Sequence, residues 1–129
     1  MLNTPCYEYS SDLIRMPYRN TFNRDHAFYM VLFHELIHWS GGSRRLNRRR
    51  NYAIPPFEAY CLEEFVAQQG SALLQGHFHM PTDSFDLDYF SAYSDSGDEA
   101  EKMLTIAHDL AKRAVEYLLN LSDRNARIA

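Results

Sequence analysis

The apolar and polar positions along the chain predict three long helices behind a short β-hairpin. The clearest helical pattern covers Glu99 to Leu121, with Lys and Arg on its polar side. Two more helices are predicted from Arg24 to Trp39 and from Pro56 to Gln75, and a short one from Ser84 to Tyr93. The apolar stripe of the last long helix consists of Leu104, Ala107, Leu110, Ala111, Ala114, Leu118 and Leu121.

The ends of the predicted helices carry recognisable signals. Asn23 is a plausible N-cap for the first helix, and Asp25 suits the positive end of its dipole. Gly41 and Gly42 end that helix, since glycine readily adopts the left-handed C′ conformation. Pro56 is expected to open the second helix. The apolar face of the first helix is assigned to Phe28, Val31, Leu32 and Trp39, together with Glu35.

The N-terminal segment predicts a hairpin, so the fold class is α+β. Tyr7–Tyr9 and Leu13–Pro17 are rich in strand-forming residues, and Ser10–Asp12 between them is typical of a turn. The 129 residues are 46% hydrophobic, which predicts one globular domain over 1–129. No segment has the length and apolarity of a membrane span or the pattern of a signal peptide. We therefore expect a cytoplasmic protein whose two cysteines, Cys6 and Cys61, are reduced.

The candidate chemistry lies in the first helix, in the segment His34-Glu35-Leu36-Ile37-His38. Histidines four residues apart lie on the same face of a helix, one turn apart. Neutral imidazole is a good Zn²⁺ ligand, and the glutamate beside the first histidine can act as general base. His-Glu-x-x-His on a helix is the zincin metal signature. The sequence therefore predicts His34 and His38 as metal ligands and Glu35 as the catalytic residue.

A catalytic zinc site needs a third protein ligand. The metzincin pattern would place it at position 44, but Arg44 cannot ligate a metal. Glu63 and Glu64 on the second helix are better candidates, and we favour Glu64, with Gln68 one turn later orienting a histidine. The competing candidates are two histidines in an irregular stretch, His77 and His79.

The formal net charge is −4, so the chain as a whole does not attract nucleic acid. Five arginines nevertheless crowd the loop after the first helix, and clustered arginines can neutralise phosphates. The alternative is a solvated loop. These candidate nucleic-acid-binding residues are Arg44, Arg45, Arg48, Arg49 and Arg50.

Several segments, taken in order, resemble the zincin-like metallopeptidase domain of ArdC-type antirestriction proteins, which is also found in polyvalent proteins of phages and plasmids. The resemblance implies a zincin fold, a bacterial mobile-element setting, Zn²⁺ on His34, His38 and Glu64, and Glu35 as acid/base. The family often has an acidic residue at the position of Gln68. ArdC-type proteins also carry an N-terminal single-stranded-DNA-binding domain, so this domain is expected to be stand-alone or the C-terminal part of a larger protein. The matching segments are Ser11–Pro17, Phe33–Gly41, Ser43–Arg48, Tyr60–Ala67 and Ala114–Leu119.

Together these observations predict a zinc-dependent hydrolase that acts on a protein or peptide. An extended substrate is expected to add to the edge strand Leu13–Met16. Tyr52, Tyr60 and Arg45 are the candidates for stabilising the oxyanion. The alternative is a DNA-protecting or protein-binding module in which the metal is structural or vestigial.

Overall fold

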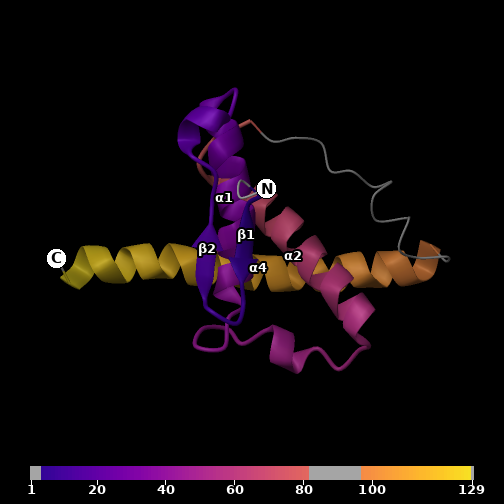
Figure 1. Ribbon diagram of the computed structural model, residues 1–129. Coiled ribbons are helices and arrows are strands. Elements are labelled where there is room, and N and C mark those ends of the chain that lie inside the picture. The colour runs from indigo at the N-terminus through magenta and orange to yellow at the C-terminus, as the bar shows by residue number, and fades with distance from the viewer. Residues whose placement is uncertain (1–3, 82–96, 129) are drawn as a thin grey trace.

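A two-stranded hairpin and three long helices form the described part of the chain (Figure 1). The computed structural model describes the backbone of residues 4–81 and 97–128 and the side chains of 4–81 and 99–121. This α+β architecture confirms the predicted fold class, while the predicted short helix at 84–93 lies outside the described residues. In chain order the elements are β1 (Cys6–Glu8), β2 (Leu13–Arg15), the 3-10 turn η1 (Arg19–Thr21), α1 (Asp25–Ser40), the 3-10 turn η2 (Arg49–Asn51), α2 (Pro56–His77) and α4 (Gly97–Ile128).

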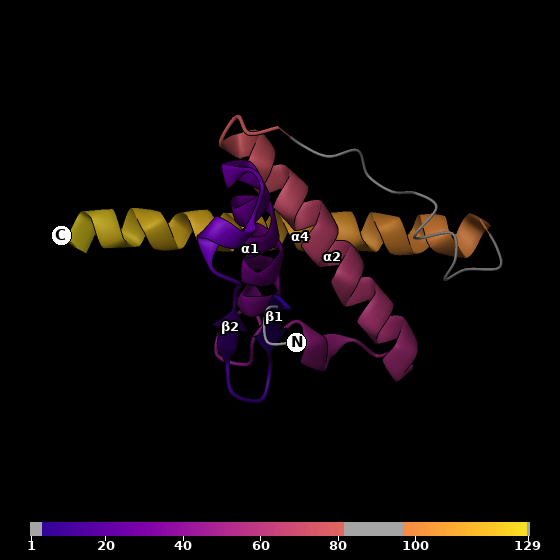
Figure 2. The same ribbon diagram turned by 45° about the horizontal axis from the view of Figure 1, so that its top comes forward.

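The long helix α4 crosses behind α1 and α2, and the hairpin lies on the opposite side of α1 (Figures 1 and 2). The predicted apolar stripe of α4 faces the other helices. Its three alanines, Ala107, Ala111 and Ala114, are fully buried, and three of its leucines pack against the same core, namely Leu104, Leu110 and Leu118. The helix extends beyond the predicted 99–121 at both ends. No helix in the described part of the chain combines the length and apolarity that crossing a membrane requires.

Helix α1 buries a different face from the one its apolar residues predicted. Ile37 is fully buried at the centre of the core, whereas Phe28, Val31, Leu32 and Trp39 are only half-buried. The helix carries apolar residues on all sides, so spacing alone could not select the core face. The buried polar residues Glu35, His38 and Ser40 show that α1 presents much of its polar surface to the protein interior.

Close packing of α1 against α2 explains the glycine in the middle of α2. A Cβ atom added to Gly70 would lie 2.6 Å from Cδ1 and 2.7 Å from Cγ1 of Ile37. The absence of a side chain at this position therefore lets the two helices approach. The same two helices carry His38 and Glu64, so this close contact lies between the elements that form the candidate site.

Both end signals predicted for α1 are wrong in detail. Arg24, not Asn23, is the N-cap residue, and it makes no side-chain capping hydrogen bond. Gly41 follows the helix with φ −87°, so it is not left-handed. Glycine is favoured at position 41 because a side chain would not fit there: a Cβ atom would lie 2.7 Å from an Nη atom of Arg48.

The hairpin is antiparallel, with Tyr7 opposite Ile14. Its turn depends on Asp12, which has a left-handed φ of 56°. The Asp12 carboxylate accepts hydrogen bonds from Tyr7 Oη at 2.6 Å and from the Arg45 guanidinium. Arg45 in turn stacks over the Trp39 ring, 3.9 Å from its centroid. These contacts attach the hairpin to the C-terminal end of α1.

Candidate metal centre

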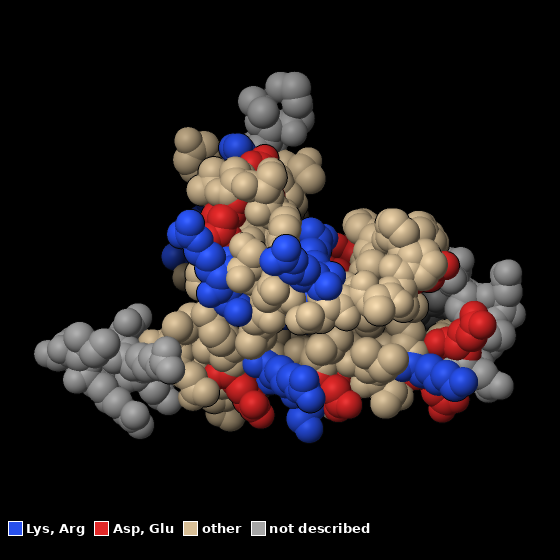
Figure 3. Space-filling model, turned by 90° about the horizontal axis from the view of Figure 1, so that it is seen from below, with Lys and Arg blue, Asp and Glu red and all other residues tan. Residues whose placement is uncertain are grey.

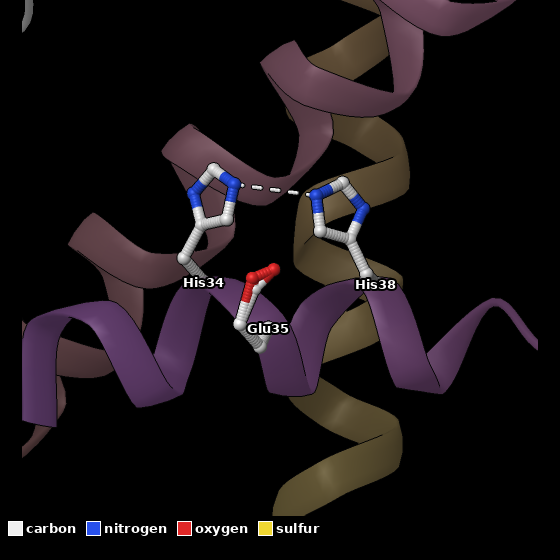
Figure 4. Close-up of side chains that lie close together, drawn as sticks. All are labelled: His34, Glu35 and His38. Atoms are coloured by element: carbon white, nitrogen blue, oxygen red, sulfur yellow. Dashed lines mark hydrogen bonds between the residues drawn. The ribbon is translucent and has the colours of Figure 1, made fainter. Parts of the chain in front are cut away.

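Two imidazoles of α1 face each other across one helical turn (Figure 4). The Nε2 atoms of His34 and His38 are 3.2 Å apart, as the spacing of four residues predicts. The Glu35 carboxylate projects on the same side of the helix, between the two rings in Figure 4. One ligand atom from each of these three residues lies within 4.8 Å of the others.

Helix α2 brings a second carboxylate to the same point. Glu64 places Oε2 3.3 Å from His34 Nε2 and Oε1 3.1 Å from His38 Nε2. Four-coordinate zinc with bonds of about 2.0–2.1 Å has ligand atoms ~3.3–3.4 Å apart at the edges of its tetrahedron. The separations among His34, His38 and Glu64 are close to this value, so the donor set fits one zinc ion.

Hydrogen bonds on the far side of each ring orient the histidines. His34 Nδ1 lies 3.0 Å from Gln68 Oε1, and His38 Nδ1 lies 2.8 Å from Glu63 Oε2. Both partners offer oxygen acceptors, so in each neutral ring the proton belongs on Nδ1 and the lone pair on Nε2. Both lone pairs therefore point to the region beside Glu64, as metal binding requires.

Glu63 and Glu64 are adjacent in sequence but face different surroundings. Glu63 is only 1% exposed and accepts a two-pronged contact from Arg48, with Nε–Oε1 at 2.9 Å and Nη2–Oε2 at 2.8 Å. Tyr52 donates a further hydrogen bond to Glu63, at 2.9 Å. Burial opposes ionisation of Glu63, but His38 and Arg48 outweigh it and lower its pKa to about 2. Glu63 is thus a buried anion behind the site.

Sequence reasoning did not find this role of Glu63 or its pairing with Arg48. The sequence signal that could have revealed it is the pair of adjacent glutamates, Glu63 and Glu64. On a helix, adjacent residues point about 100° apart, so two neighbours cannot both face the histidines in the same way. Glu64 faces the Nε2 atoms and Glu63 supports His38 from behind.

The charges around the site favour ionised Glu64 and a less acidic Glu35. Burial raises the pKa of Glu64, but hydrogen bonds with His34 and His38 outweigh burial and lower it. Glu35 is 5% exposed, and burial raises the pKa of its carboxyl group above the ordinary value. Burial lowers the pKa of His38, yet Glu63 and Glu64 together raise it to about 9.

An open cleft of about 610 Å³ reaches the site. Of the three oxyanion candidates, Tyr60 lines the cleft, whereas Tyr52 and Arg45 do not. His77 and His79 also lie outside its lining. The hairpin borders the cleft through β1 and not through the β2 strand predicted to receive substrate. The lining residues are Pro5, Cys6, Tyr7, Met30, Val31, His34, Glu35, His38, Arg49, Tyr60, Glu64, Gln68, Ser71, Ala72 and Gln75.

The structure divides the five loop arginines into two groups. Arg48 is 5% exposed and bound to Glu63, and Arg45 is held by Asp12 and Trp39. Arg44, Arg49 and Arg50 are exposed. On the face shown in Figure 3, Lys and Arg side chains lie in separate patches with Asp and Glu among them. The nucleic-acid prediction therefore depends on the three exposed arginines.

A helix-borne His-Glu-x-x-His segment, met by a glutamate from a second helix, is the arrangement typical of zincins. Comparison with known families agrees: the model described as "zincin-like metallopeptidase" matches residues 2–111, and the chain belongs to this family. A solved structure, the metal-free antirestriction ArdC protein from the R388 plasmid, is similar over 90% of this chain, with a TM-score of 0.72 and 28% identity. A DNA primase, TraC of Escherichia coli, is 36% identical over 70 residues, or 53% of this chain. The chain spans 42% of the ArdC chain and 5% of TraC.

Proposed function

We propose that this domain is a zinc-dependent peptidase. The observation that carries the proposal is the convergence of His34 Nε2, His38 Nε2 and Glu64 on one point, with the buried Glu35 carboxylate beside it in an open cleft. When bound there, zinc would supply a Lewis acid that acidifies water and polarises a carbonyl group. The three ligands leave a fourth position for water or substrate.

Glu35 is the proposed general base and acid. Burial raises the pKa of its carboxyl group towards the range in which a general base works well near neutral pH. Glu35 would take a proton from the attacking water and return it to the leaving amine. Tyr60, which lines the cleft one helical turn before Glu64, is the proposed donor to the carbonyl oxygen as negative charge develops there.

The test is cleavage of a quenched-fluorescent peptide library by the zinc-loaded protein. Glu35→Gln removes the base and keeps the side-chain shape, so we expect cleavage to fall at least 100-fold. The matched control is Glu116→Gln, an exposed glutamate on α4, which should leave cleavage unchanged. Equal cleavage by the Glu35→Gln and wild-type proteins would rule out this role of Glu35.

We also propose a biological setting: an antirestriction-type role on a mobile element in a bacterial cytoplasm. This proposal is supported by the similarity to the antirestriction ArdC protein of a plasmid. Cys6 and Cys61 are both free thiols, which suits a reducing compartment. A direct check is plasmid transfer into a restricting host with wild-type protein or with the Glu35→Gln variant.

A second candidate function is nucleic-acid binding by the loop between α1 and α2. The exposed side chains of Arg44, Arg49 and Arg50 favour it. Three phosphate contacts on a single strand would give a log–log salt slope of about −2. Replacing Arg44 and Arg50 with Gln should then flatten the slope to about −0.7. Undetectable binding of a fluorescent oligonucleotide at low salt would refute this function. The proposed zinc-dependent peptidase would not be affected.

A further inference from the structure

The cleft has two chemically different ends. Pairs of contacting residues on α1 and α2 show how the two helices run along it. His38 meets Glu64, His34 meets Gln68, and the Met30 carbonyl accepts a hydrogen bond from Ser71 Oγ at 2.9 Å. The two helices therefore run antiparallel along the cleft. The lining residues of α2 extend from Tyr60 to Gln75, a rise of about 22 Å at ~1.5 Å per residue, so the cleft can hold roughly six or seven residues of extended peptide.

The end beyond Gln68 is uncharged. Met30, Val31 and Ala72 line it with Ser71 and Gln75. Gln75 donates a hydrogen bond through Nε2 to Ser71 Oγ at 3.1 Å. Since the Gln75 amide and the other side chains here are all uncharged, this end of the cleft offers no charge to a ligand.

Arg49 is the one Lys or Arg among the described residues that line the cleft, and the contacts of its neighbour Arg48 place it at the Tyr60 end. Its neighbour Arg48 donates to the carbonyl oxygen of Ile37 at 2.8 Å, which places this part of the loop beside the C-terminal half of α1. The Arg49 guanidinium lies over the Tyr9 ring, 5.3 Å from the centroid, a distance at which cation–π attraction acts.

Arg49 differs from Arg45 and Arg48 in its lack of an acidic partner among the described residues. Arg45 and Arg48 are paired with Asp12 and Glu63, whereas Arg49 forms no ion pair with any residue in 4–81 or with the described side chains of α4. A guanidinium presents a planar pair of donors that matches a carboxylate. Glu35 and Glu64, the carboxylates among the described lining residues, belong to the candidate metal site.

We propose that Arg49 determines substrate specificity by binding a carboxylate of the peptide, on the substrate segment that lies at the Tyr60 end of the cleft. The inference rests on the proposed peptidase function and names its substrate class. The carboxylate is that of an Asp or Glu side chain or of the peptide C-terminus. Both sources present the same two oxygens to the guanidinium.

The experiment measures binding separately from turnover. Zinc-loaded Glu35→Gln protein is titrated into fluorescein-labelled heptapeptides of Ala and Gly, and binding is followed by anisotropy at low salt. Asp is placed at each position in turn, with Asn at the same position as the uncharged partner. A further pair compares a free C-terminus with a C-terminal amide. We expect a three- to tenfold preference for the charged member in one pair or a few adjacent pairs.

Two arginine substitutions identify the residue responsible. Arg49→Gln should abolish the preference, while Arg50→Gln, an equal loss of charge outside the cleft, should preserve it. A preference in the Asp series identifies a side-chain carboxylate, and one in the terminal pair identifies the C-terminus. The inference is overturned if no peptide binds, if no pair differs, or if the preference survives Arg49→Gln.

Cleavage by the wild-type protein separates this inference from the proposed function. Cleavage without any dependence on peptide charge overturns the role of Arg49 and leaves the peptidase standing. An Arg49-dependent preference without cleavage of any peptide retains the carboxylate site and refutes the peptidase.

Discussion

Replacing Arg48 with Met tests whether this arginine stabilises the fold through its buried ion pair with Glu63 or behaves like an exposed surface arginine. The wild-type guanidinium donates to both Glu63 oxygens, to the Ile37 carbonyl at 2.8 Å and to Ser40 Oγ at 3.2 Å. Arg48→Met would remove the guanidinium that pairs with the carboxylate of Glu63, which is 1% exposed, and leave only the His38 imidazole and the Tyr52 hydroxyl as hydrogen-bonding partners of that carboxylate among the described residues. Breaking a buried pair by removing one partner costs about 3–5 kcal/mol.

The assay is urea denaturation of metal-free protein in EDTA, followed by circular dichroism. Removing metal matters because a ligand that binds the native state adds its own stabilisation. At an unfolding entropy of ~2.1 cal/mol/K per residue, a loss of 3–5 kcal/mol in a chain of this length corresponds to a fall in Tm of about 11–18 °C. Arg50→Met, at an exposed position, should change the free energy of unfolding by no more than about 0.5 kcal/mol.

A double variant sharpens the result. Arg48→Met combined with Glu63→Met removes both charges, so the combined loss should be clearly smaller than the sum of the two single losses. A loss below about 1 kcal/mol in Arg48→Met would refute the reasoning, because a surface arginine behaves in that way.

Two further predictions concern helix α2. Gly70→Ala adds a methyl group against the fully buried Ile37. We expect the free energy of unfolding in urea denaturation to fall by about 1–2 kcal/mol, despite the better helix propensity of Ala. Adding Ile37→Val, which removes a methyl group at the contact, should recover part of this loss. Gln68→Leu removes the acceptor at His34 Nδ1, so zinc affinity measured by competition with a chromogenic chelator should fall about 10- to 100-fold, whereas Gln68→Glu should raise it. An unchanged affinity in Gln68→Leu would show that His34 needs no such support.

Much of the fold could be predicted from the sequence because its signals are local. The stripe of α4 has a helical period, and the two histidines of α1 share a face through backbone geometry alone. The position of Glu64 opposite His34 and His38 also followed, since a metal site needs a third donor and few residues could supply it. This placement also requires that the loop after α1 let α2 pack back against it, so that Glu64 reaches the histidines.

The features that were missed depend on tertiary contacts. The burial of Ile37 is decided by what packs against α1, and an all-round apolar helix gives no sign of it. Gly41 was expected to adopt a special backbone conformation, yet it provides space for Arg48, which comes from a loop seven residues away. Arg48 was predicted, with four other arginines, either to bind nucleic acid or to lie in a solvated loop, and its pairing with Glu63 explains why it is buried instead.

The central claim is that His34, His38 and Glu64 hold one zinc ion while Glu35 does not. The most direct measurement is a zinc titration by isothermal calorimetry of the wild-type, Glu64→Gln and Glu35→Gln proteins. We predict one equivalent for wild type, nearly the same affinity for Glu35→Gln, and a loss of at least about tenfold for Glu64→Gln. Glu64, unlike Glu35, has a carboxylate oxygen within 3.3 Å of each imidazole Nε2. Loss of zinc in Glu35→Gln with retention in Glu64→Gln would contradict the account.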